Sequence, residues 1–340
     1  MELLELTKRL STLSGPTGFE TPVFQWAADH LSPFADEIRT DALGNLMAFK
    51  RCGKPGAKTV LINAHMDEIG LIVTGAERGF LKFSNLGGVD QRMLPARDVR
   101  VLSDPPLFGV VATMPPHILT AEEQDKAFSM DKLYIDVGLT QEEAEKIAPP
   151  GTPVVYDTGC DELGDGWLCG KALDDRACAA IVMKAFEMLS QKELPVDLCC
   201  LLSTQEEVGH RGAAVAAVNV APDIAIVVDV THGKTPDGKN VPCTCGKGAA
   251  VGIGPNMNGA LARQLMALAT EKNIPFQPEA VPGGNSGTDT EAIQISRTGV
   301  TTALISLPLK YMHTPVEVVS VRDMTAVVDL ITAYVEGAEV

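Results

Sequence analysis

Side chains that can bind metal ions follow several short apolar segments of this 340-residue chain. They are His65 and Asp67 in "INAHMDE", Asp174 and Asp175 in "KALDDR", Glu206 and Glu207 in "STQEEVGH", Asp229 in "VVDVTHG" and His313 in "YMHTPVE". Any one of them could be a helix cap or a turn residue. Burying so many carboxylates together requires a compensating cation, because their repulsion and desolvation would otherwise be prohibitive. The pattern therefore predicts a metal site.

The ligand types narrow the choice of metal. Two imidazoles with several carboxylates suit zinc, cobalt or manganese better than calcium, and the lack of a cysteine among them argues against a purely structural zinc site. The number of candidate ligands favours two divalent ions that share one carboxylate, as in sites where two metal ions act together. One acid then remains for proton transfer.

The elements that must position these side chains have the pattern of an α/β protein. Continuous apolar, β-rich runs at residues 59–65, 196–204 and 223–229 are typical of strands that are buried on both faces. Helical patterns at 175–192 and 259–272 lie between and after them. We expect a three-layer α/β/α sandwich with a mostly parallel sheet, and ligands of such sheets bind at the carboxyl ends of strands.

The residue pattern of the sequence changes between residues 70 and 160. Short strand-like runs, among them "GLIVT", "GFLKFS" and "LYIDVG", are broken there by Gly and Pro at close spacing. This pattern is typical of a small barrel or sandwich. The sequence thus predicts a discontinuous catalytic domain at 1–69 and 161–340, interrupted by an inserted β-barrel domain at 70–160.

Composition excludes some classes of partner. The formal charge of −16 and the pI near 4.8 argue against binding to nucleic acid or to an anionic membrane. The eight cysteines include the adjacent pair Cys199 and Cys200 inside an apolar run, which suits reduced core thiols better than disulfides. The start of the chain lacks the pattern of a secretory leader, and no segment reaches the length of a membrane span. We expect a cytoplasmic protein.

Seven motifs in order carry a resemblance to a known family. They are "LSGPTGFETPV", "AHMDEIGLIV", "GKALDDRACA", "STQEEVGHRGA", "VVDVTHG", "GGNSGTDTEAIQISRTGV" and "KYMHTPVEVV", between residues 13 and about 322. At this spacing the chain resembles the glutamyl and deblocking aminopeptidases of the tetrahedral aminopeptidase family, which are two-metal enzymes. The resemblance implies a metallo-aminopeptidase that removes N-terminal residues from peptides.

The resemblance also implies a role for each site residue. Asp174 corresponds to the ligand that bridges the two ions, His65 and Asp229 to the ligands of one ion, and Glu207 and His313 to those of the other. Glu206 corresponds to the general base. Asp67 corresponds to a carboxylate behind His65 that orients its ring.

The chain also departs from the family pattern. His210 stands where many relatives carry an apolar residue, and Thr314 stands where Ser is common; neither change removes a ligand. His210 is interpreted as a loop histidine without a role, and His117 and His232 are left unassigned. The preferred N-terminal residue of the substrate does not follow from the sequence.

Three rival functions are considered. A related two-metal deacylase or carboxypeptidase would share the ligands, but in those enzymes the extra domain generally falls between the fourth and last ligands rather than between His65 and Asp174. An endoglucanase is disfavoured because aromatic residues make up only 5% of the chain. A non-catalytic peptide-binding scaffold would not need Glu206.

The resemblance further implies an assembly. In the family the inserted domain mediates dimerisation, and dimers build a hollow tetrahedral dodecamer that admits peptides. We therefore expect a homo-oligomer.

Overall fold

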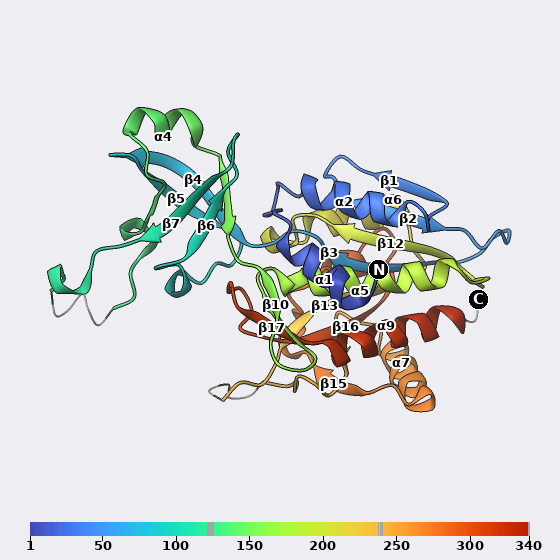
Figure 1. The fold of residues 1–340 in the computed structure, drawn as a ribbon. Coiled ribbons are helices and arrows are strands. Elements are labelled where there is room, and N and C mark those ends of the chain that lie inside the picture. The colour runs from blue at the N-terminus through green and yellow to red at the C-terminus, as the bar shows by residue number, and fades with distance from the viewer. Residues whose placement is uncertain (121–125, 237, 239–240, 339–340) are drawn as a thin grey trace.

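The computed structural model describes residues 1–340 except 121–125, 237, 239–240 and 339–340. The N- and C-terminal parts of the chain form a large sheet with helices on both faces, and a smaller β-barrel projects to one side of this sheet (Figure 1). The predicted fold class, an α/β sandwich with a small β-barrel, is confirmed.

The sheet is parallel at its centre and antiparallel at its flanks. The central strands pair in parallel in the order β12 (Asp197–Ser203), β3 (Thr59–His65), β13 (Ile224–His232) and β16 (Thr301–Lys310). One flank consists of β1 (Glu37–Thr40) and β2 (Leu46–Lys50). The other flank consists of β17 (Glu317–Ser320), β11 (Trp167–Gly170) and β10 (Cys160–Glu162). In addition, β14 (Ala249–Ile253) pairs with β16 and with β15 (Phe276–Ala280). The parallel centre is the part that ends at the candidate site.

The apolar runs form central strands because both of their faces are covered. In β12, Leu198, Cys200 and Leu202 pack into one core, and Cys199 and Leu201 pack into the core on the opposite face. Alternate side chains of a strand point to opposite faces, so a strand covered on both sides needs apolar residues at every position. This explains the continuous runs in the sequence.

More helices cover one face of the sheet than the other. The larger core is closed by α1 (Leu3–Thr12), α2 (Thr21–Leu31), α5 (Leu173–Ser190), α7 (Gly259–Lys272) and α9 (Val321–Glu336). The smaller core is closed by α6 (Arg211–Val220) and α8 (Thr290–Gln294). α7 begins where Asn258 accepts hydrogen bonds from the backbone N–H groups of Ala260 and Leu261, as expected of an N-cap.

The barrel is closed and has a core of its own. Its strands are β4 (Gly70–Glu77), β5 (Phe80–Leu86), β6 (Asp98–Val101), β7 (Leu107–Ala112), β8 (Tyr134–Asp136) and β9 (Pro153–Tyr156), and the helix α4 (Gln141–Ile147) lies beside them. Leu81, Val99, Ile135 and Val154 are among the fully buried residues of its interior. The runs "GLIVT", "GFLKFS" and "LYIDVG" named from the sequence fall on β4, β5 and β8.

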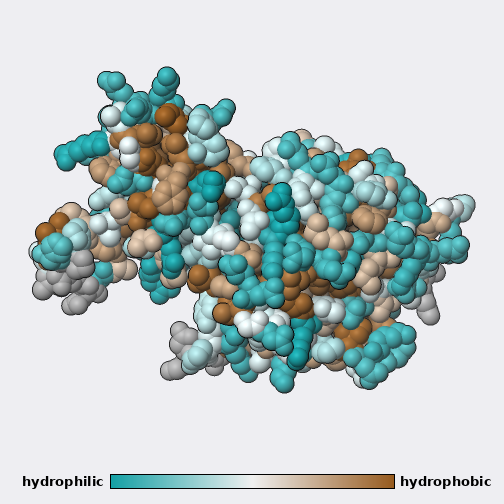
Figure 2. Space-filling model, in the orientation of Figure 1, coloured by the Kyte–Doolittle hydropathy of each residue, from teal (hydrophilic) through white to brown (hydrophobic). Residues whose placement is uncertain are grey.

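Short 3-10 turns complete the described structure: η1 (Gln91–Met93), η2 (Pro116–Ile118), η3 (Met130–Lys132), η4 (Glu206–Val208) and η5 (Pro282–Gly284). The surface is mostly hydrophilic, with apolar residues gathered over the barrel in the view of Figure 2. No helix within the described part of the chain is both long enough and apolar enough to cross a membrane.

Candidate active site

The carboxyl ends of the central strands bring the predicted residues together. His65 is the last residue of β3 and is in register with Ser203, the last residue of β12. Glu206 and Glu207 follow β12 on η4, while Asp229 lies near the end of β13. Parallel strands end at a common edge, so residues far apart in the chain meet here.

The first group of potential ligands is fully inside the protein. Side-chain oxygen or nitrogen atoms of His65, Asp174, Asp175 and Asp229 all lie within 4.8 Å of one another, and the four residues are buried. His65 Nε2 lies 3.2 Å from Asp174 Oδ1. Three carboxylates around one imidazole form a site for a cation rather than a stable cluster by themselves.

The second group shares Asp174 with the first. Potential ligand atoms of Asp174, Glu207 and His313 also lie within 4.8 Å of one another. His313 Nε2 lies 3.3 Å from Asp174 Oδ2 and 3.4 Å from Glu207 Oε2. The two oxygens of Asp174 therefore face different histidines, which is the arrangement that a carboxylate shared by two ions requires.

The electrostatics of the two groups fit cations. Burial and the charge of Asp174 raise the pKa of Glu207 to about 8. Burial and the charge of Asp175 raise the pKa of Asp229 well above its ordinary value. Both carboxylates lie among other acids, and no lysine or arginine is among the described residues that line the pocket, so divalent ions would supply positive charge there.

A hydrogen bond fixes the tautomer of His313. Its Nδ1 donates to the carbonyl oxygen of Gly88 at 2.9 Å, so the lone pair of Nε2 would face Asp174 and Glu207 when the ring is neutral. Gly88 lies between the barrel strands β5 and β6, so the barrel side of the molecule contributes to the site. No local sequence pattern marks this contact, since the two residues are 225 positions apart.

Asp67 contacts both His65 and the turn that carries Glu206 and Glu207. Its Oδ1 lies 3.3 Å from His65 Nδ1, while its two oxygens accept hydrogen bonds from the backbone N–H groups of Glu206 and Glu207 at 3.1 and 3.2 Å. Burial would raise the pKa of Asp67, but these partners lower it below its ordinary value. One carboxylate thus ties β3 to the turn that carries both glutamates.

Two further acids, Glu317 and Asp175, contact the site, and neither was given a role from the sequence. Glu317, at the start of β17, accepts hydrogen bonds from the backbone N–H of Asp174 at 3.0 Å and of His313 at 2.8 Å. Asp175 accepts one from His65 N at 3.2 Å through Oδ2, and its buried Oδ1 has no hydrogen-bond partner among the residues that the structure describes. Asp175 was visible beside Asp174, whereas nothing in the sequence marked Glu317.

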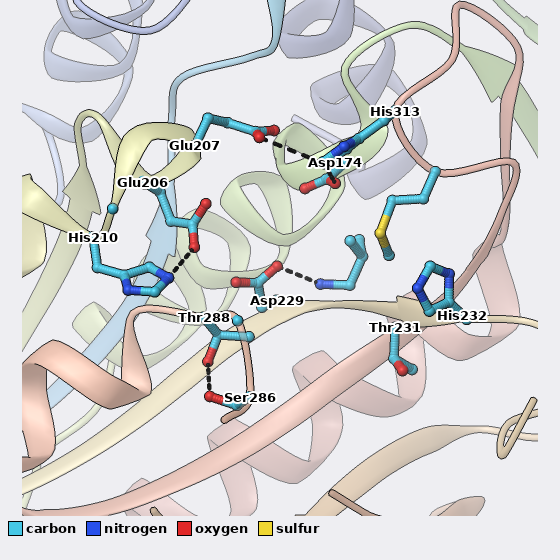
Figure 3. A pocket seen from close by; sticks show the side chains of 14 residues that line it. Asp174, Glu206, Glu207, His210, Asp229, Thr231, His232, Ser286, Thr288 and His313 are labelled. Atoms are coloured by element: carbon cyan, nitrogen blue, oxygen red, sulfur yellow. Dashed lines mark hydrogen bonds and ion pairs between the residues drawn. The ribbon is translucent and has the colours of Figure 1, made fainter. Parts of the chain in front are cut away.

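Glu206 lies apart from both groups of potential ligands. It is buried, its Oε2 lies 3.8 Å from His65 Nε2, and its Oε1 lies 2.9 Å from His210 Nε2. Adjacent carboxylates on the η4 turn therefore have different surroundings: Glu207 belongs to the second group, whereas Glu206 belongs to neither group and turns toward His210 (Figure 3). This geometry suits a proton carrier next to a metal site.

These residues open into a pocket of about 410 Å³. Beyond the residues already described, its lining consists of Gly209, Val230, Thr231, His232, Ser286, Gly287, Thr288 and Met312. His210 and His232 are thus beside the site (Figure 3), whereas His117 is an exposed residue on η2. The pocket gives a small molecule or a chain end access to Glu206.

Comparison with known proteins agrees with this geometry. Residues 44–330 match the M42 glutamyl aminopeptidase family. A lysyl aminopeptidase of Pyrococcus furiosus is 35% identical over 340 residues, which cover 98% of this chain and 96% of the relative.

Solved structures share the whole fold. A TET aminopeptidase from a marine-sediment archaeon of the Thaumarchaeota has a TM-score of 0.93 at 30% identity, with 99% of this chain and 98% of that chain covered. The TET1 peptidase of Pyrococcus horikoshii, described as able to assemble into a tetrahedron or a large octahedral shell, has a TM-score of 0.88 at 29% identity, with 99% and 100% covered. This chain therefore belongs to the M42 glutamyl aminopeptidase family, and the predicted activity, that of a metallo-aminopeptidase, is confirmed.

Proposed function

We propose that this aminopeptidase works with two divalent ions that share Asp174. His65 and Asp229 would hold one ion, and Glu207 and His313 the other. The observation that carries the proposal is the position of Asp174, whose Oδ1 and Oδ2 lie 3.2 and 3.3 Å from the two histidines. Imidazole and carboxylate ligands suit zinc, cobalt or manganese.

The ions would supply Lewis acidity at the scissile carbonyl and would lower the pKa of a coordinated water. The chain supplies the proton transfer. Glu206 accepts the proton of the attacking water and donates it to the nitrogen of the leaving amine, a task that suits a carboxylate that lines the pocket 3.8 Å from His65 Nε2. Asp67 holds both the ring of His65 and the backbone of Glu206, so the base and a ligand keep a fixed relation.

Other residues orient the ligands. Glu317 accepts hydrogen bonds from the backbone of Asp174 and of His313, and the carbonyl of Gly88 orients the ring of His313. Residues of this kind are expected to influence metal affinity about 10- to 100-fold. We propose that they keep the two groups at the separation that two ions require.

The substrate class is a peptide with a free N-terminus. The test is hydrolysis of a panel of aminoacyl-nitroanilides by protein that has been stripped of metal and reloaded with zinc, cobalt or manganese, with a soluble β-glucan as the matched non-peptide substrate. We expect turnover of nitroanilides only, dependent on metal and lost in Glu206→Gln. Glucan hydrolysis without peptide hydrolysis would contradict the proposal.

We also propose an oligomeric, cytoplasmic enzyme in which the barrel at 70–160 forms a domain that mediates dimerisation and dimers build a dodecamer. The assembly of the Pyrococcus horikoshii relative supports the proposed oligomer. Eight cysteines without a disulfide support the proposed cytoplasmic location. Light scattering should give a mass well above the 36.0 kDa of one chain. A fully active monomer at micromolar concentration would refute the assembly.

A further inference from the structure

His210 is the side chain that contacts the carboxylate of Glu206 from the side of the pocket. Its Nε2 lies 2.9 Å from Glu206 Oε1, and its side chain is 21% exposed. Figure 3 shows the imidazole turned toward Glu206 at the edge of the pocket. The side chain of His210 is therefore accessible from the pocket but mostly buried.

The backbone turns sharply to make this contact. His210 follows Gly209 and has φ 56°, a left-handed conformation that few residues other than glycine adopt. Its N–H donates to the carbonyl oxygen of Glu206 at 3.0 Å, and α6 begins at the next residue. The turn thus folds His210 back over the residue that it contacts.

Glu206 has little else to hold its Oε1. Among the described residues no hydrogen bond reaches this buried atom, and the His210 ring at 2.9 Å is in ion-pair contact with it without meeting hydrogen-bond geometry, while Oε2 lies 3.8 Å from His65 Nε2. A carboxylate fixed only through its backbone can rotate about its side-chain bonds. The contact with His210 removes that freedom at one oxygen and leaves the other facing the ligand groups.

We propose that His210 is a positioning residue for Glu206: it donates a hydrogen bond from Nε2–H to Oε1 and leaves Oε2 as the oxygen that carries the proton during hydrolysis. The inference rests on the proposed role of Glu206 as the base. It does not depend on the charge of the ring, since both the imidazolium and one neutral tautomer carry a proton on Nε2. The 2.9 Å separation is short enough that a small rotation of the ring would complete this hydrogen bond, which the charge of the carboxylate would strengthen.

A purely structural explanation for His210 makes a different prediction. Histidine and asparagine are both enriched in the left-handed region, so His210 could serve the backbone alone. His210→Asn would then be harmless. His210→Gln discriminates the two explanations, because the Gln amide nitrogen can take the place of Nε2, whereas the shorter Asn side chain cannot reach Oε1.

The experiment compares both variants, in the wild-type and Glu206→Gln backgrounds, as full-length metal-loaded protein on an aminoacyl-nitroanilide. We expect His210→Asn to lower kcat by about 10- to 100-fold with KM nearly unchanged, the size expected for a misplaced catalytic group. His210→Gln should recover most of that loss. Metal content and melting temperature should match those of the wild type, and His210→Asn should cause no further loss in Glu206→Gln.

Two results would overturn the inference while leaving the proposed function intact: His210→Asn with the kcat of the wild type, or equal losses in His210→Asn and His210→Gln. An additive loss in the double variant would overturn it as well, because His210 would then act independently of Glu206. A wild-type protein without peptide hydrolysis, or a fully active Glu206→Gln variant, would instead show that the proposed function or base is wrong.

Discussion

Adding one methyl group at Gly88 would test whether the barrel side of the molecule shapes the site. A Cβ at Gly88 would lie 2.6 Å from His313 Nδ1, whereas ordinary van der Waals contact begins at 3.4 Å, so the ring would have to move by about 3.4 − 2.6 = 0.8 Å. The same shift would weaken the 2.9 Å hydrogen bond from Nδ1 to the Gly88 carbonyl. A displacement near 1 Å can cost about 100-fold in rate. We therefore expect Gly88→Ala to lower kcat/KM by about that factor.

The assay is peptide hydrolysis together with a metal titration. Gly88→Ala should weaken the ion proposed at Glu207 and His313 and retain the one at His65, with a small change in melting temperature. Gly75→Ala in β4 is the matched control, since a Cβ there meets no atom within 4 Å. The reasoning is refuted if Gly88→Ala keeps wild-type activity and binds both ions normally.

Three further predictions concern charge and burial. Asp174→Asn removes the shared charge, so metal analysis should find both ions weakened and activity lost; two tightly bound ions would disprove sharing. Asp67→Asn replaces one acceptor oxygen with an amide donor beside the Glu206 and Glu207 N–H groups, and metal affinity should fall about 10- to 100-fold in a competition titration. Arg176 is fully buried and donates to several backbone carbonyls, so Arg176→Leu should cost about 3 kcal/mol or more in a denaturation experiment, whereas Arg263→Leu at an exposed position of α7 should be nearly neutral.

Periodicity predicted the elements that form the centre of the sheet. The run at 59–65 coincides with β3, and the helical pattern at 259–272 coincides with α7. The run at 223–229 continues in the structure to His232, because β13 extends along β16 past Asp229. Local pattern identifies buried strands well, but the point where a strand ends depends on the neighbour with which it pairs.

Metal-competent side chains at strand ends predicted the members of the site but not what holds them. Glu317 and Gly88 act through contacts with a backbone N–H and with a histidine ring far away in the chain, and no local pattern marks such contacts. His210 was interpreted as a loop histidine, yet the η4 turn brings it to 2.9 Å from Glu206. Tertiary geometry, rather than residue type, determines these relations.

The central claim is that the adjacent residues Glu206 and Glu207 have different roles, one moving a proton and the other binding an ion. The most direct test is metal stoichiometry measured beside kcat in Glu206→Gln and Glu207→Gln. Glu206→Gln should keep two ions per chain while kcat falls by about 10²- to 10⁴-fold, and Glu207→Gln should lose one ion and recover partly in excess metal. These two roles are wrong if Glu206→Gln loses metal while Glu207→Gln keeps both ions.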